Sequence, residues 1–132
     1  AEDWATHQLE HELSGMFDVT HGAGLSAVWP SWARYVYKEN VSRFVRFAVN
    51  VMGVPNDFSD PEATALRGIA AMERFYHDIG MPITIPELIG RKATDEEIKE
   101  MARKCSRNYK STQGRFKVLN AEDMENIYQM AK

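Results

Sequence analysis

The stretch from residue 3 to residue 37 decides the expected fold, and it reads DWATHQLEHELSGMFDVTHGAGLSAVWPSWARYVY. Apolar residues recur at helical spacing on both sides of a short break at 18–20. This pattern predicts one helix over residues 2–17 and a second over residues 22–37. Pro30 stands inside the second helix, where its ring and its missing N–H are expected to kink or interrupt it.

The middle of the chain continues the helical spacing. Residues 40–52 place their apolar side chains on one face, and Gly53 is expected to end that helix. Asp60 followed by Pro61 is typical of a helix start. The apolar stripe of this next helix is Leu66, Ile69, Met72, Tyr76 and Ile79. Residues 83–90 are expected to form a loop with about one helical turn.

Two further helices are expected near the C-terminus. Thr94 and Glu97 have the spacing of a capping box, and Asn120 is a good N-cap for the last helix. A polar run from Asn108 to Gly114 separates the two helices, and no convincing strand is found. The expected fold class is therefore all-α, a helical bundle of about six helices in a single domain over residues 1–132.

Composition excludes several classes of protein. The chain has 132 residues, 44% of them hydrophobic, which is enough for one core but not for two full domains. A net charge of −3 without a basic tract argues against a nucleic-acid partner, and no apolar run is long enough to predict a membrane span. One cysteine, Cys105, excludes a disulfide framework and favours a reducing, cytoplasmic location. The chain begins Ala1-Glu2-Asp3 without a signal peptide or an initiator Met, which is expected of a processed or cut piece.

Three of the four histidines lie in the first 21 residues: His7, His11 and His21. His7 and His11 are four residues apart and share a helix face. The local apolar residues centre on the opposite face and are Ala5, Leu9, Leu13, Met16 and Phe17. The histidines are therefore expected to face away from the core, toward solvent or toward something that this chain does not contain. Imidazole is a common ligand of iron and zinc, so the cluster favours a metal site over a solvated face.

The residues alone leave two other interpretations open. His7-x-x-Glu10-His11 matches the inverted zinc-peptidase pattern, in which both histidines bind zinc and Glu10 activates water. A third ligand would then be needed, and Glu73 or Glu87 could be proposed although nothing selects either. The non-enzymatic alternative is a freestanding helical interaction module with an incidental histidine cluster.

A longer signature in the same stretch is more specific than the peptidase pattern. It runs H-x3-H-x9-H-G and continues to a proline, and its residues are His7, His11, His21, Gly22 and Pro30. With the whole stretch from residue 3 to residue 37, it resembles the iron-containing alcohol dehydrogenases, and within them the butanol dehydrogenase-like branch. The remaining helices resemble in order those of that family's C-terminal domain.

This resemblance implies roles for the three histidines. His7 and His21 are expected to bind a divalent metal, Fe2+ or Zn2+, that acts as a Lewis acid on the substrate oxygen. His11 is expected not to be a ligand but to lie near the nicotinamide and the substrate, as a cofactor-binding and catalytic residue that orients substrate or relays a proton. The implied reaction is hydride transfer between NAD(P) and a primary alcohol or aldehyde such as butanol or butanal.

The resemblance covers only about the last third of such an enzyme. The family's other two ligands, an Asp and a His, cannot be placed here, and Gly22-Ala23-Gly24 is not a phosphate loop because no strand precedes it. The N-terminal dinucleotide-binding domain is therefore expected to be absent from this chain. We expect little metal retention and no dehydrogenase activity from the chain alone, and homo-oligomerisation of the intact enzyme.

Overall fold

The computed structural model describes residues 5–107 and 117–132. These residues form seven α-helices: α1 (Ala5–Phe17), α2 (His21–Val36), α3 (Val41–Arg46), α4 (Pro61–Asp78), α5 (Ile85–Ile89), α6 (Asp95–Cys105) and α7 (Ala121–Ala131). A 3-10 turn, η1 (Tyr37–Asn40), and a π-helical segment, η2 (Phe47–Val51), flank α3. No strand is formed in this part of the chain, so the expected all-α class is confirmed. The short α5 is the helical turn expected between residues 83 and 90.

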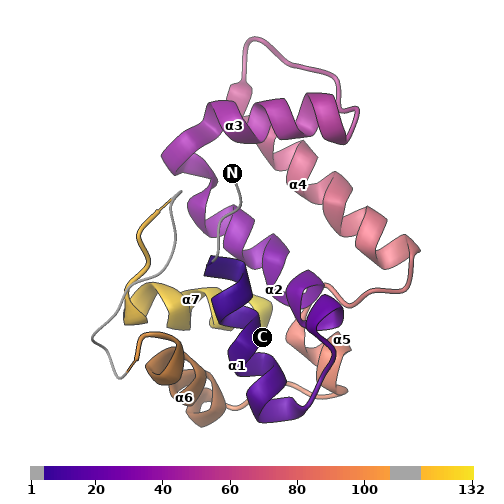
Figure 1. Cartoon of the computed structure of the whole chain (residues 1–132). Coiled ribbons are helices and arrows are strands. Elements are labelled where there is room, and N and C mark those ends of the chain that lie inside the picture. The colour runs from indigo at the N-terminus through magenta and orange to yellow at the C-terminus, as the bar shows by residue number, and fades with distance from the viewer. Residues whose placement is uncertain (1–4, 108–116) are drawn as a thin grey trace.

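The helix α2 is central to the packing. It contacts α1, α4, α5 and α7, and α6 lies against both α1 and α7. In Figure 1, α1, α6 and α7 gather in the lower half of the molecule, whereas α3 and α4 lie in the upper half. Burying each large apolar side chain of the core stabilises the fold by about 1.5–3 kcal/mol. The largest of these include Leu9, Leu13, Val28, Ile69, Ile98, Met101, Met124 and Ile127.

The expected helix starts are confirmed by their hydrogen bonds. The side chain of Asp60 accepts from the N–H of Ala63 at 3.1 Å. Thr94 and Glu97 cap each other, at 3.1 Å and 2.9 Å. A reciprocal bond also joins Asn120 and Asp123 at the start of α7. These local bonds satisfy backbone N–H groups that have no partner within a helix.

The helix α2 is not interrupted at Pro30, contrary to one part of the sequence expectation. It is one element from His21 to Val36, and Pro30 is buried inside it. A proline removes one hydrogen bond from the helical ladder. Here the packing of α2 on its neighbours keeps the helix continuous across that loss.

The inward face of α4 is rotated from the predicted apolar stripe. Leu66 and Ile79 are 37% and 57% exposed. The buried residues of α4 are Thr64, Ala65, Gly68 and Ile69. The reason is a close approach to η2: a Cβ on Gly68 would lie 2.8 Å from the Cα of Ala48. This contact turns the Gly68 side of α4 inward and Leu66 outward.

Two expectations lie outside the described residues: the helix start at residue 2, and the polar run at 108–114. In the described part of the chain, no helix combines the length and the apolarity needed to cross a membrane.

Candidate metal centre

The histidine cluster is assembled by the connection between α1 and α2. Asp18 ends α1 with a left-handed φ of +52°, and its N–H donates to the Ser14 carbonyl at 3.0 Å. Aspartate tolerates this conformation better than most residues. The chain reverses here, α2 begins directly at His21, and the two helices pack against each other. The turn thereby brings His21 beside the histidines of α1.

The three imidazole rings lie close together. The rings of His7 and His21 are stacked, with centroids 5.1 Å apart and an interplanar angle of 27°. The rings of His11 and His21 meet edge to face, with centroids 6.1 Å apart. His11 and His21 are exposed and His7 is partly exposed, whereas Leu9 and Leu13 of the same region are fully buried. The expectation that the histidines face away from the core is confirmed.

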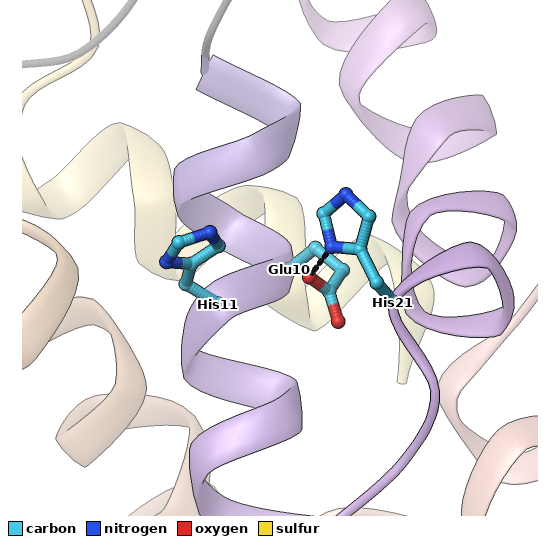
Figure 2. A group of neighbouring side chains, drawn as sticks. All are labelled: Glu10, His11 and His21. Atoms are coloured by element: carbon cyan, nitrogen blue, oxygen red, sulfur yellow. Dashed lines mark hydrogen bonds and ion pairs between the residues drawn. The ribbon is translucent and has the colours of Figure 1, made fainter.

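A buried carboxylate lies under this cluster. Glu10 is 0% exposed, and its Oε2 contacts Nδ1 of His21. Its other oxygen, Oε1, accepts from the hydroxyl of Ser14, which also contacts the Val19 carbonyl at 3.2 Å. Figure 2 shows Glu10 and His11 projecting from α1, with the Glu10 carboxylate reaching the ring of His21. Glu10 thus joins the two helices at the site.

A glycine of α2 makes room for that carboxylate. A Cβ on Gly24 would lie 2.6 Å from Cγ of Glu10, well inside van der Waals contact. A Cβ on Gly22 would come no closer than 3.7 Å to Met81, which is an ordinary contact. Of the two glycines, Gly24 is therefore the one at which the packing leaves no room for a side chain.

The donor atoms present suit a divalent metal. Glu10, His11 and His21 each offer a ligand atom, and these atoms lie within 4.8 Å of one another. Glu10, however, is buried and has both oxygens engaged, so we assign it a supporting position rather than a place among the ligands. Histidine nitrogens are suitable donors for Fe2+ and Zn2+. Contacts bring both His7 and His11 to His21.

The same contacts argue against the inverted zinc peptidase. In that class the glutamate between the histidines must be free to activate water, but Glu10 is buried and occupied. The two residues considered as a third ligand are engaged elsewhere. Glu73 pairs with Arg34, and Glu87 accepts from the N–H of Ile83 at 3.0 Å.

Sequence reasoning gave Glu10 a role only in that peptidase alternative and passed over Ser14. Two features of the sequence nevertheless point to the contacts of Glu10. Ser14 follows Glu10 by four residues, which places both on one side of α1. Gly24 interrupts a helical pattern, which often marks a close approach of another group.

Comparison with known proteins gives a consistent result. The model of the Fe-containing alcohol dehydrogenase family, C-terminal, matches residues 1–132. A probable NADH-dependent butanol dehydrogenase 1 of Bacillus subtilis is 35% identical over 125 residues, which are 95% of this chain and 31% of that protein. NADH-dependent butanol dehydrogenase A of Clostridium acetobutylicum is 32% identical over 127 residues, with the same coverage of both chains.

A solved structure carries the same fold. The crystal structure of NADH-dependent butanol dehydrogenase A from Thermotoga maritima aligns with a TM-score of 0.84 and 32% identity, over 98% of this chain and 33% of that one. The chain therefore spans about a third of the length of the proteins it matches. On the residues matched, the chain belongs to the Fe-containing alcohol dehydrogenase family and corresponds to its C-terminal, helical part.

Proposed function

We propose that this chain supplies two metal ligands, His7 and His21, and a substrate-side histidine, His11, to a metal-dependent alcohol dehydrogenase. The reaction would transfer a hydride between NAD(P) and a primary alcohol or aldehyde such as butanol or butanal. One observation carries the proposal: three imidazoles meet where α1 joins α2, on a face turned away from the core. Similarity to proteins described as NADH-dependent butanol dehydrogenases supports this reaction.

The chain's own residues would hold and orient the reactants. A divalent metal bound there would supply Lewis-acid polarisation of the substrate oxygen. The buried apolar face of α1 fixes the helix, so His7 and His11 start from a rigid backbone. His11, one turn beyond His7 and exposed, would donate a hydrogen bond to the substrate oxygen and move a proton between that oxygen and solvent.

The proposal includes parts that lie outside these residues. An Asp and a His ligand, a dinucleotide-binding domain, a homo-oligomeric assembly and a cytoplasmic location all belong to it. Two ligands hold a metal weakly, so the isolated chain should retain little metal and show no dehydrogenase activity. Tight stoichiometric binding of Zn2+ or Fe2+ by the isolated chain would contradict this part of the proposal.

A chimera tests the assignment directly. The corresponding third of the Thermotoga maritima enzyme is replaced by this chain, and metal content and NADH-dependent reduction of butanal are measured. We expect His7→Ala and His21→Ala to lose the metal and the activity together. His11→Ala should keep the metal and lower turnover by about 10²–10⁴-fold, the usual contribution of a proton-transferring group.

The fourth histidine is the matched control. His77 is exposed at the end of α4, is paired with Asp78 at 3.7 Å and is absent from the ring contacts of the cluster. His77→Ala should change neither measurement. Loss of metal in His11→Ala would favour the peptidase-type ligand pair, and unchanged metal content in all four variants would favour an interaction module.

A further inference from the structure

We infer that Glu10 is a positioning residue, which holds the imidazole proton of His21 on Nδ1 and thereby leaves Nε2 free to bind the metal. The inference rests on the proposed function in one respect, namely that His21 is a ligand. Glu10 of α1 would thus determine which nitrogen of His21 binds the metal and how the ring of His21 is oriented.

Glu10 is removed from solvent at the junction of α1 and α2. Its side chain is 1% exposed, whereas that of His21 is 47% exposed. A carboxylate removed from water needs partners for its oxygens. Both partners lie at the α1–α2 junction: Ser14 on Oε1 and Nδ1 of His21 on Oε2. The position of the carboxylate is thus tied to the ring of His21.

The surroundings of the carboxylate hold it in place. Leu9, directly before Glu10 on α1, is fully buried in the core. On the other side, α2 approaches so closely at Gly24 that a Cβ there would lie 2.6 Å from Cγ of Glu10. The carboxylate is therefore enclosed at the contact between α1 and α2, where both of its oxygens already have partners.

The hydrogen-bond chemistry then selects the tautomer. An ionised carboxylate only accepts, and a neutral imidazole carries one N–H. With Nδ1 donating to Glu10, Nε2 retains its lone pair, and in Figure 2 the second ring nitrogen lies on the side away from Glu10. Carboxylates placed in this way fix the tautomer of metal-binding histidines in many proteins.

The tautomer of His21 can be measured without any metal. The full 132-residue chain is labelled with 15N-histidine, and long-range 1H–15N correlation spectra are recorded at a pH where the ring of His21 is neutral. We expect the proton on Nδ1 in the wild type. Glu10→Met, which keeps the length but removes the acceptor, should shift His21 toward the Nε2–H form that free imidazole side chains prefer. Glu10→Gln should rescue the Nδ1–H form because its amide oxygen still accepts.

Two further variants keep the test decisive. Glu12→Met removes a half-buried acid from the same helix, one that interacts with Lys104 rather than with His21, and should leave the tautomer unchanged. If circular dichroism shows that Glu10→Met does not fold, Gly24→Ala replaces it, because the added methyl group displaces the carboxylate. A wild-type ring protonated on Nε2, or an Nδ1–H form that persists without the carboxylate, would overturn the inference.

A Zn2+ titration of the same substitutions separates this inference from the proposed function, and it is made in the chimera described above because the isolated chain is expected to hold metal only weakly. Loss of a carboxylate behind a ligating histidine typically lowers metal affinity by about 10–100-fold, which is the drop expected for Glu10→Met, with a smaller drop for Glu10→Gln. If the tautomer behaves as expected and His21→Ala leaves Zn2+ binding unchanged, the ligand assignment fails and the positioning by Glu10 stands. A Zn2+ affinity that depends on His21 but not on Glu10 would overturn the positioning role.

Discussion

Cys105 is a single residue whose chemistry is set by its surroundings. It is 4% exposed, at the end of α6, and burial raises the pKa of its thiol to about 12, with a further contribution from the charge of Glu12. The thiolate is the reactive form of cysteine, so this thiol should be inert in the folded chain. Cys105 therefore packs as a small hydrophobic residue of the core.

Thiol labelling checks this. With Ellman's reagent in neutral buffer, Cys105 should react at least about a hundredfold more slowly in the native chain than in guanidinium chloride. The free amino acid cysteine in the same two solutions controls for the effect of denaturant on the reagent. Rapid labelling of the native chain would show that α6 opens far more readily than its packing indicates.

At the scale of one helix, the start of α6 depends on Glu97. Its carboxylate accepts hydrogen bonds from the Arg91 guanidinium and from the Thr94 N–H. These bonds lower the pKa of Glu97 from 4.5 to about 2, and the bond from Arg91 has the largest effect. A pKa lowered by folding stabilises the fold above the unfolded value. The stabilisation is therefore complete at neutral pH and is lost as the pH falls from 4.5 toward about 2.

Substitution of Glu97 should reveal this dependence. We expect Glu97→Ala to lower the free energy of unfolding by about 1–2 kcal/mol at neutral pH, and the difference from wild type to shrink in acid. Glu96→Ala, in the same first turn of α6, is the matched control and should cost only a few tenths of a kcal/mol. Urea denaturation at several pH values measures both, and a pH-independent difference would contradict the role of the charge.

The helices were predictable because their signals are local. Asp60 precedes a proline, Thr94 and Glu97 are three residues apart, and Asn120 is a good N-cap residue, so each helix start is recognised from a few neighbouring residues. The rotation of α4 was not predictable, since it follows from contact between Gly68 and Ala48, which are distant in sequence. The candidate metal centre shows the same difference between local signals and long-range contacts. The histidine cluster follows from a short signature, whereas the supporting position of Glu10 depends on how α2 folds back onto α1.

A buried hydrogen bond joins the first helix, α1, to the last, α7. The hydroxyl of Tyr128 on α7 donates to the carbonyl of Leu9 on α1 at 2.6 Å, and both residues are fully buried. Burial is the main reason that the pKa of Tyr128 is raised well above its ordinary value. The hydroxyl therefore keeps its proton and remains a donor. This bond ties α7 to the helix that carries His7 and His11.

We expect Tyr128→Phe to reduce the free energy of unfolding by about 0.5–1.5 kcal/mol, because the substitution removes the buried hydrogen bond to Leu9 and the weaker one between the Tyr128 hydroxyl and the Cys105 thiol. Tyr35→Phe is the comparison: its hydroxyl bonds Asp123 of α7 at the same 2.6 Å but is only partly buried, so its loss should cost less. Thermal unfolding followed by far-UV circular dichroism measures both. An equal loss in the two variants would contradict the importance of burial at Tyr128.

The enclosure of Glu10 by Gly24 also has an evolutionary consequence. The space at the junction holds either a carboxylate from α1 or a side chain from α2, but not both. The two positions should therefore covary among relatives, with a residue larger than glycine at position 24 accompanied by a small one at position 10. A lineage that made this exchange would keep the helix junction and would have to orient its ligand histidine by some other group.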